Sequence, residues 1–135
     1  MITTGDAMSE IHILALSGLL TCVQFALMAI PANQQLGPEW TMGARDVPRE
    51  MTGVAGRLHR AFNNQLEGLL LFAVAAVCVT LLDASTPFTR GAAVVYIVAR
   101  VVYIPLYALG VPLWRSLIWA AGFVATAAML IAALL

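Results

Sequence analysis

Four long apolar runs alternate with shorter polar segments along the 135-residue chain. They cover residues 11–30, 57–82, 91–109 and 112–135. An α-helix rises about 1.5 Å per residue, so about 20 apolar residues cross a hydrocarbon core of about 30 Å. The pattern therefore predicts four membrane-spanning helices. Because the second and third connections are short, we expect an all-α, integral membrane, antiparallel four-helix bundle that forms a single domain over residues 1–135.

Proline and small polar residues mark the predicted ends of these helices. Residues before the first run form a short polar leader in which Ser9 or Asp6 is a candidate N-cap. Pro31 directly follows that run and predicts the end of its helix. Pro105 lies inside the third run and predicts a kink or a freed backbone carbonyl, whereas Pro112 suits the first turn of the fourth helix.

Residues 32–56 form the one long polar segment between apolar runs. Connections of this length are uncommon in compact proteins unless they have a role of their own. Two interpretations remain open at this point. The segment is either a functional or partner-contacting loop, or a simple connector.

The composition agrees with a membrane protein and excludes other classes. The chain is 61% hydrophobic and 10% charged, whereas a soluble domain has about 25% charged residues. Its formal net charge of zero gives no electrostatic basis for binding nucleic acid. Cys22 and Cys78 fall inside apolar runs, and no Cys/His cluster has the spacing of metal ligands. We therefore expect buried spectator thiols and no metal site.

The distribution of arginine predicts an orientation in the membrane. The first and third connections and their flanks contain five arginines, and the opposite side has only Arg90; the five are Arg45, Arg49, Arg57, Arg60 and Arg115. The positive-inside rule places those two connections in the cytoplasm and both termini outside. Trp40 and Trp114 fall on the same side, as expected for residues that anchor a helix at the interface.

A polar stripe follows one face of the second predicted helix. Its residues are three, four and three positions apart, which places them on one helical face; they are Arg57, Arg60, Asn64 and Glu67. Glu67 lies about ten residues, or about 15 Å, into this helix. Arg100 lies at a matching depth in the antiparallel third helix. We expect a Glu67–Arg100 ion pair, because each charge alone is costly in the bilayer.

More polar side chains are expected at the cytoplasmic half of the same bundle. Tyr103 and Tyr107 share a helical face with Arg100, and Arg115 and Ser116 open the fourth helix at the same level. Several arginines with one deep carboxylate leave net positive charge, which suits an anionic ligand with carboxylate or phosphate groups. The alternative is that the outer arginines extend individually to the membrane interface.

These two motifs resemble those of a known family. The Arg-x-x-Arg-Ala-x-x-Asn-x-x-Glu sequence at Arg57–Glu67 resembles the second-helix signature of the MAPEG superfamily (membrane-associated proteins in eicosanoid and glutathione metabolism). The Arg-x-x-Tyr-x-x-x-Tyr sequence at Arg100–Tyr107, followed by Arg115-Ser116, resembles the third and fourth helices of that family. The segments Pro31–Asn33 and Arg45-Asp46 look like those of bacterial members, which implies a bacterial inner membrane.

The resemblance implies a homotrimer that binds glutathione between neighbouring subunits, on the cytoplasmic side. By matching positions, the peptide would be held by Arg57, Arg60, Asn64, Glu67, Tyr103 and Tyr107. Arg115 or Ser116 would stabilise the thiolate, since a nearby cation lowers the pKa of a thiol. Lipophilic electrophiles would arrive from the bilayer. The implied activity is a glutathione-dependent transferase or peroxidase.

Two departures from the pattern of catalytic members keep an alternative open. The first apolar run has no basic residue, and Asn63 stands where several active members have one. The alternative is a non-catalytic membrane subunit that binds lipid or docks on a larger complex. A small proton-coupled transporter is disfavoured, because residues 11–30 contain no acidic side chain.

Overall fold

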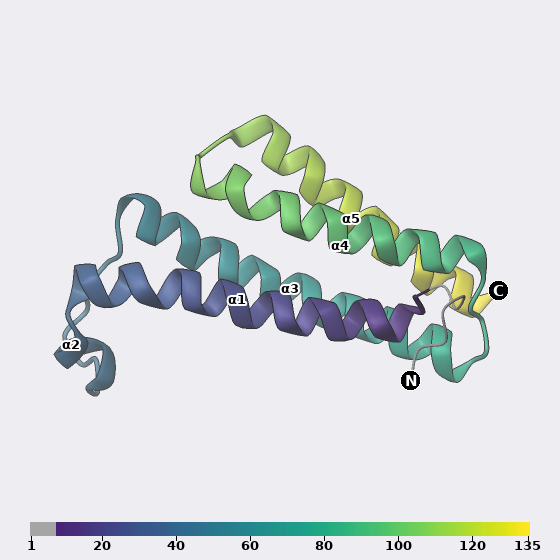
Figure 1. Cartoon of the computed structure of the whole chain (residues 1–135), viewed down its shortest axis with the longest axis horizontal. Helices are drawn as coiled ribbons and strands as arrows, with labels where there is room; N and C mark the ends of the chain where they lie inside the picture. The colour runs from purple at the N-terminus through teal and green to yellow at the C-terminus, as the bar shows by residue number, and fades with distance from the viewer. Residues whose placement is uncertain (1–7) are drawn as a thin grey trace.

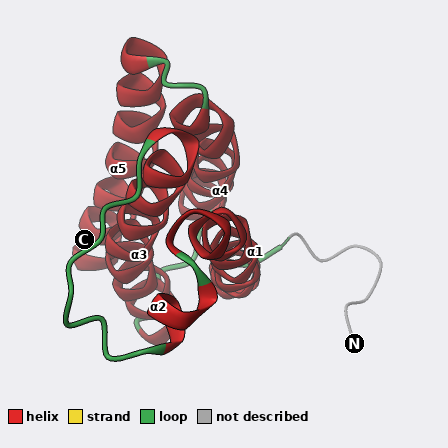
Figure 2. Ribbon diagram, turned by 90° about the vertical axis from the view of Figure 1, so that its left-hand side faces the viewer, coloured by secondary structure: helices red, strands yellow, loops and turns green. Residues whose placement is uncertain are grey.

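The computed structural model describes residues 8–135, and this part of the chain contains helices and no strand (Figure 2). The helices are α1 Glu10–Leu36, α2 Pro38–Met42, α3 Gly53–Leu81, α4 Pro87–Ala108 and α5 Pro112–Leu134. All but the short α2 are long and apolar enough to cross a membrane. The expectation of an all-α chain with four such helices is confirmed.

The long helices form an antiparallel bundle with a central pair (Figure 1). Helices α3 and α4 contact each other and also both other long helices, α1 and α5. Within the described residues, no Cα atom of α1 lies within 8 Å of a Cα atom of α5. The start of α1, the α3–α4 turn and the C-terminus lie at one end of the bundle, and α2 and the α4–α5 turn lie at the other (Figure 1).

The apolar core lies mainly between α3 and α4. The rings of Phe72 and Tyr96 stack there with centroids 3.9 Å apart, and both side chains are buried. Ala75, Ala76 and Ala93 are also fully buried. Small residues at these positions let the backbones approach closely, which is how helices pack in a membrane.

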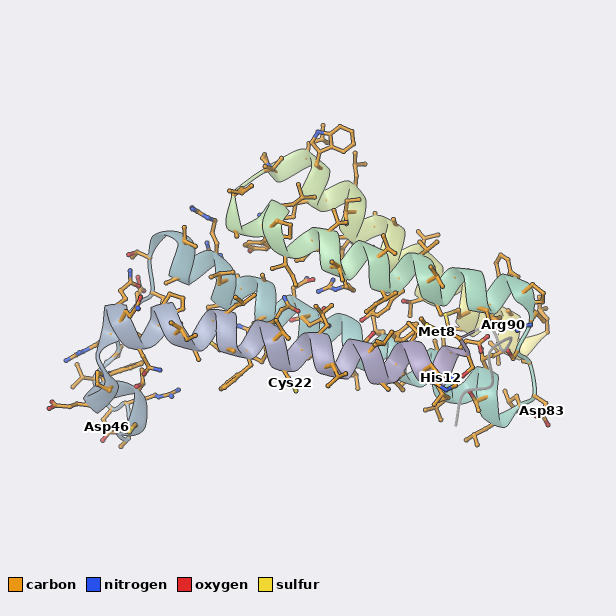
Figure 3. The ribbon with its side chains drawn as sticks, viewed as in Figure 1. Met8, His12, Cys22, Asp46, Asp83 and Arg90 are labelled. Carbon is orange, nitrogen blue, oxygen red and sulfur yellow. The ribbon has the colours of Figure 1, made fainter. Side chains whose placement is uncertain are left out.

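Large apolar side chains cover the outside of the bundle. Leu19, Leu70 and Val124 are each more than 60% exposed, at 64%, 68% and 63%. Charged side chains lie near the two ends, as Asp46 and Arg90 do in Figure 3. Cys22 points outward from the middle of α1 (Figure 3), so the expectation that this thiol is buried is wrong. An outer surface of this kind is suited to lipid chains.

The first helix is longer than its apolar run. Ser9 caps it through a capping box with His12, and the other candidate cap, Asp6, lies outside the described residues. The expected end at Pro31 is wrong, because α1 continues to Leu36. Ala32 and Leu36 are both buried, at 6% exposure each, and this packing offsets the backbone hydrogen bond that proline removes.

The next two helices begin four residues before their predicted starts. Helix α3 begins at Gly53 and α4 at Pro87, where Thr86 forms a capping box with Thr89. The start of α3 requires glycine at Gly56, since a Cβ there would lie 2.7 Å from the carbonyl oxygen of Met51. Neither feature belongs to an apolar run, so hydropathy alone does not find these starts.

The long connection between α1 and α3 is ordered by polar contacts. Trp40 donates its indole N–H to the carbonyl of Val47 at 2.6 Å. Arg49 donates to the carbonyl of Leu36 at 2.7 Å, and Gln35 both donates to and accepts from Thr52. These bonds hold α2 and the residues after it against the end of α1.

A buried carboxylate joins the helices at the opposite end. Glu10 is 1% exposed, and its carboxylate accepts hydrogen bonds from Thr89 at 2.5 Å and from Ser85 at 3.0 Å. These contacts connect the first turn of α1 to the turn between α3 and α4. Hydrogen bonds to a charged acceptor are about twice as strong as neutral ones.

We expect Glu10→Ala to lower the free energy of unfolding by about 1–3 kcal/mol, because it leaves the buried Thr89 hydroxyl without its acceptor. Glu10→Gln retains an acceptor oxygen and should cost less. The apparent melting temperature in detergent measures both effects. Glu50→Ala, at an exposed site, is the control. Equal melting temperatures for the two alanine variants would contradict a stabilising role for Glu10.

Candidate functional site

A polar cleft opens between α3, α4 and α5, in the half of the bundle nearer the α4–α5 turn. Its volume is about 640 Å³. It is lined by Arg60, Asn63, Asn64, Glu67, Tyr103, Tyr107, Arg115, Ser116, Trp119 and Ala120. The structure thus brings together all but one of the predicted ligand and catalytic residues, and it adds Asn63, Trp119 and Ala120.

Two arginines and two tyrosines form a continuous row of contacts that runs from Arg100, outside the cleft lining, to Arg115 in the lining. The guanidinium carbon of Arg100 lies 4.7 Å from the ring centroid of Tyr103. That ring meets Tyr107 edge-on, with centroids 5.5 Å apart. The guanidinium carbon of Arg115 lies 4.6 Å from the Tyr107 ring. Cations over aromatic faces are attracted to the ring, so the stack holds Arg115 at the cleft without a carboxylate partner.

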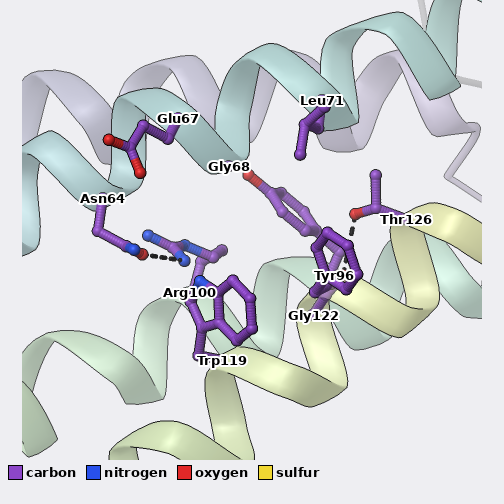
Figure 4. Close-up of a pocket in the computed structure, with 10 residues that line it drawn as sticks. Asn64, Glu67, Gly68, Leu71, Tyr96, Arg100, Trp119, Gly122 and Thr126 are labelled. Carbon is purple, nitrogen blue, oxygen red and sulfur yellow. Dashed lines mark hydrogen bonds between the residues drawn. The ribbon is translucent and has the colours of Figure 1, made fainter.

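The structure does not pair Arg100 with Glu67, contrary to expectation. Arg100 is 3% exposed and donates from Nε to Gln65 at 2.7 Å and from Nη1 to Asn64 at 2.9 Å. No carboxylate lies within ion-pair distance of Arg100 in the described part of the chain. Glu67 is exposed on the cleft side of α3 (Figure 4). Arg100 instead bonds to Asn64, one helical turn before Glu67 on the same face of α3, and to the buried Gln65.

Gln65 is the principal residue of this site that the sequence reasoning missed. It is fully buried, accepts from Arg100 and donates to Thr21 on α1 at 3.1 Å. A chain of polar contacts therefore runs from α1 through α3 to α4. A polar residue in the middle of an apolar run is a detectable signal, but Gln65 is about 100° away from Asn64 on the helix and so falls off the polar stripe.

Arg57 is the predicted ligand residue that lies outside the cleft lining. Its Nε donates to the carbonyl of Ala108 at 2.9 Å. That carbonyl belongs to the last turn of α4, where backbone oxygens lack helical partners and cations are favoured. Arg57 thus connects the start of α3 to the end of α4. Its contact is structural, unlike the cleft-lining positions of Arg60, Asn64 and Glu67 on the same helical face.

The two arginines that line the cleft, Arg60 and Arg115, make no such hydrogen bonds to the described part of the protein. Within residues 8–135, the guanidinium groups of Arg60 and Arg115 make no hydrogen bond or ion pair, although both line the cleft. Glu67 is the only acidic residue in the lining. The Ser116 hydroxyl donates to the carbonyl of Pro112 at 3.1 Å. The cleft therefore keeps a net positive charge, as the sequence predicted.

The fold and the cleft define a class of protein: a bundle of four potential membrane-spanning helices with a basic, tyrosine-lined site at one end. The model of the MAPEG family matches residues 13–135, which is nearly the whole chain. The chain belongs to the MAPEG family and is an integral membrane protein. No curated protein and no solved structure matches it significantly. Across the described residues, no group of His, Cys, Asp and Glu is arranged to hold a metal ion.

The contacts of Arg100 predict which substitution damages the fold. We expect Gln65→Leu to lower the free energy of unfolding by about 2–3 kcal/mol, because it leaves a buried guanidinium N–H without an acceptor. Glu67→Gln, in which the side chain keeps its size, should leave stability nearly unchanged. Melting temperatures of the two variants in detergent decide the point. A larger loss for Glu67→Gln would show that the charge of Glu67 stabilises Arg100 more than the hydrogen bond to Gln65 does.

Proposed function

We propose that this protein is a glutathione-dependent transferase or peroxidase that acts on lipophilic electrophiles. One observation carries the proposal: two uncommitted guanidinium groups, Arg60 and Arg115, line a polar cleft of about 640 Å³ in a MAPEG-family bundle. Glutathione is an anionic peptide whose carboxylates suit guanidinium donors. The volume lies within the range of small-molecule sites, about 300–1,000 Å³.

Arg115 is the residue that we assign to the thiol. A thiol has a pKa of about 8.5, and a nearby cation lowers this value and so raises the fraction of thiolate. The stack on Tyr107 positions Arg115, and no carboxylate among the described residues neutralises it. Ser116 is a second candidate, which would donate its hydroxyl to the sulfur after releasing the Pro112 carbonyl. The thiol releases its proton to solvent, and the thiolate sulfur bonds to the electrophilic carbon of the second substrate and displaces its leaving group, which is chloride in chlorodinitrobenzene.

The other lining residues would bind the peptide part of glutathione. Arg60 supplies charge, and the amides of Asn63 and Asn64 supply neutral donors. Glu67 is placed to accept from the amino group, and Tyr103 and Tyr107 add hydroxyl groups. Arg57 is not among the residues we assign to the ligand. The arrangement needs no metal ion, since every role is filled by a side chain.

The assembly and orientation are also proposals. A homotrimer would bring a neighbouring subunit against the cleft. From the arginine distribution and the resemblance to bacterial members, we propose that α2 and the α4–α5 turn face the cytoplasm at a bacterial inner membrane, with both termini outside. Glutathione is a cytosolic thiol, so this orientation exposes the cleft to it. Lipophilic substrates would enter laterally from the bilayer.

The proposal is tested with purified protein, glutathione and chlorodinitrobenzene. We expect turnover, and we expect Arg115→Ala to lower kcat/KM by about 10–100-fold through loss of thiolate stabilisation. The ultraviolet absorbance of bound thiolate should fall in parallel. Arg115→Lys retains a cation and should keep part of the activity.

Arg90→Ala is the matched control, because Arg90 lies at the opposite end of the bundle (Figure 3). It should leave turnover and glutathione binding unchanged. Absence of both turnover and glutathione binding would sink the enzymatic proposal. The fold would then serve as a non-catalytic membrane subunit that binds lipid or docks on a larger complex.

A further inference from the structure

A groove lies between the end of α1, the short helix α2 and the start of α3, apart from the polar cleft. Helix α2 packs beside the end of α1 (Figures 1 and 2). The volume of the groove is about 320 Å³, and its lining shares no described residue with that of the cleft. This volume falls in the range of small-molecule sites, about 300–1,000 Å³, so the groove is a second potential binding site.

The deeper part of the groove is apolar and follows one face of α1. Phe25, Met28, Ala32 and Leu36 belong to the lining and are three or four positions apart. They extend over about 16 Å of helix. Ala32 and Leu36 are buried and form the floor, whereas Phe25 is 54% exposed, and its ring meets Phe62 of α3 edge-on with centroids 5.7 Å apart. An alkyl chain in the bilayer can therefore lie along this face of α1.

The end of the groove nearest α2 is polar and contains a cation. Arg45 donates from Nε and Nη2 to the carbonyl of Thr41, at 3.1 and 2.7 Å, and its guanidinium carbon lies 5.5 Å from the ring centroid of Trp40. Within residues 8–135, its Nη1 group has no hydrogen-bond partner, and neither has the imidazole of His59 in the same lining. Both groups can donate to phosphate oxygens.

The backbone at Arg45 has an uncommon conformation. Its φ is 59°, in the left-handed region that is unfavourable for a residue with a Cβ atom. In this conformation the guanidinium group folds back over α2, onto the Thr41 carbonyl and the Trp40 ring. The side chain is therefore held at the groove by two contacts and keeps one N–H₂ group for a ligand.

No carboxylate competes for these donors. Among the described residues that line the groove, none is acidic. Glu39 and Asp46 are close to Arg45 in sequence, but they line a neighbouring pocket, and neither forms an ion pair with Arg45 in the described part of the chain. The polar end of the groove therefore complements an anionic group with oxygen acceptors.

The two parts of the groove lie where the two parts of a phospholipid lie. Trp40 is in the lining, and tryptophan is enriched at the level of the lipid headgroups. Arginine at this level attracts anionic headgroups. From there, the apolar face of α1 leads toward the middle of the helix, which is the direction of an acyl chain.

We propose that this groove binds one anionic phospholipid of the surrounding bilayer. The phosphate oxygens accept from Nη1 of Arg45 and from the imidazole of His59, and an acyl chain lies along Met28 and Phe25. The lipid is a structural ligand that undergoes no reaction, so this binding is separate from the function proposed above.

The test uses the full-length chain in detergent micelles with brominated phosphatidylglycerol or brominated phosphatidylcholine. Trp114→Phe and Trp119→Phe leave Trp40 as the only tryptophan. Bromine on the acyl chains quenches its emission when a lipid occupies the groove, and quenching is expressed relative to the same lipid without bromine. We expect half-maximal quenching at about fivefold lower concentration for the anionic lipid, as expected for one arginine beside an anionic headgroup.

Arg45→Gln should reduce this preference to about one, because the side chain keeps a donor but loses its charge. Arg90→Gln is the matched control. Arg90 also donates to the carbonyl of the residue four positions before it, but it lies at the opposite end of the bundle (Figure 3). This control should retain the full preference.

Ala29→Leu is an independent variant that leaves Arg45 in place. Ala29 is half-buried in the lining, so a leucine there fills the groove. We expect the preference for the anionic lipid to disappear. Ala26→Leu is the control, because Ala26 is exposed on α1 and lies outside the lining.

Equal quenching by the two lipids in the Trp40-only protein would overturn the proposal, and so would an unchanged preference in both Arg45→Gln and Ala29→Leu. Soluble glycerol phosphate has the same phosphate chemistry without an acyl chain, and it should not displace the brominated lipid. Displacement would assign the groove to a free phosphate and not to a lipid. Glutathione is absent throughout, so none of these outcomes bears on the enzymatic proposal.

Discussion

The buried guanidinium group of Arg100 is the constraint on which the arrangement of the bundle depends. Placing a cation in the middle of an apolar bundle costs several kcal/mol unless its N–H groups are satisfied. Amide oxygens on α3 accept from two of the three guanidinium nitrogens, Nε and Nη1, and Gln65 extends the contact to Thr21 on α1. The small residues between these two helices bring the backbones close enough for it to form.

The same interaction determines what the cleft offers to a ligand. Arg100 can only donate, so Asn64 must present its carbonyl oxygen to Arg100 and its amide NH₂ group remains for the cleft. Arg100 also lies against Tyr103, and the aromatic stack continues to Arg115. The buried Arg100 thus orients the amide of Asn64 as a neutral donor. Through Tyr103 and Tyr107 it also supports the guanidinium of Arg115, which is unpaired within the described residues. The site is preorganised by residues that do not need to touch the ligand.

The sequence was sufficient to predict the four long helices and most of the residues that line the cleft. It did not predict the features that depend on packing between helices, namely where α1 ends and how α3 is rotated. Apolar length is sufficient to find a spanning helix, but the continuation of α1 past Pro31 depends on burial of Ala32 and Leu36 against the bundle. Depth along a helix predicted that Glu67 and Arg100 lie at one level. Depth alone does not predict how α3 is rotated about its own axis. In the structure that rotation turns Gln65 inward and Glu67 toward the cleft. Such rotations are set by contacts among several helices and are not encoded in one apolar run.

Counting cations in the sequence also overstated the charge available for a ligand. Arg45, Arg49 and Arg57 donate to backbone carbonyls near helix ends. Such bonds satisfy oxygens that a helix terminus leaves free, so these side chains belong to the scaffold. Arg60 and Arg115 remain for the cleft. If Arg115 serves the thiolate, one guanidinium is left for the carboxylates of glutathione. The neutral amides of Asn63 and Asn64 must then supply the remaining hydrogen bonds to those carboxylates. An amide donates to a carboxylate without adding charge, so Asn63 is a compatible replacement for a basic residue.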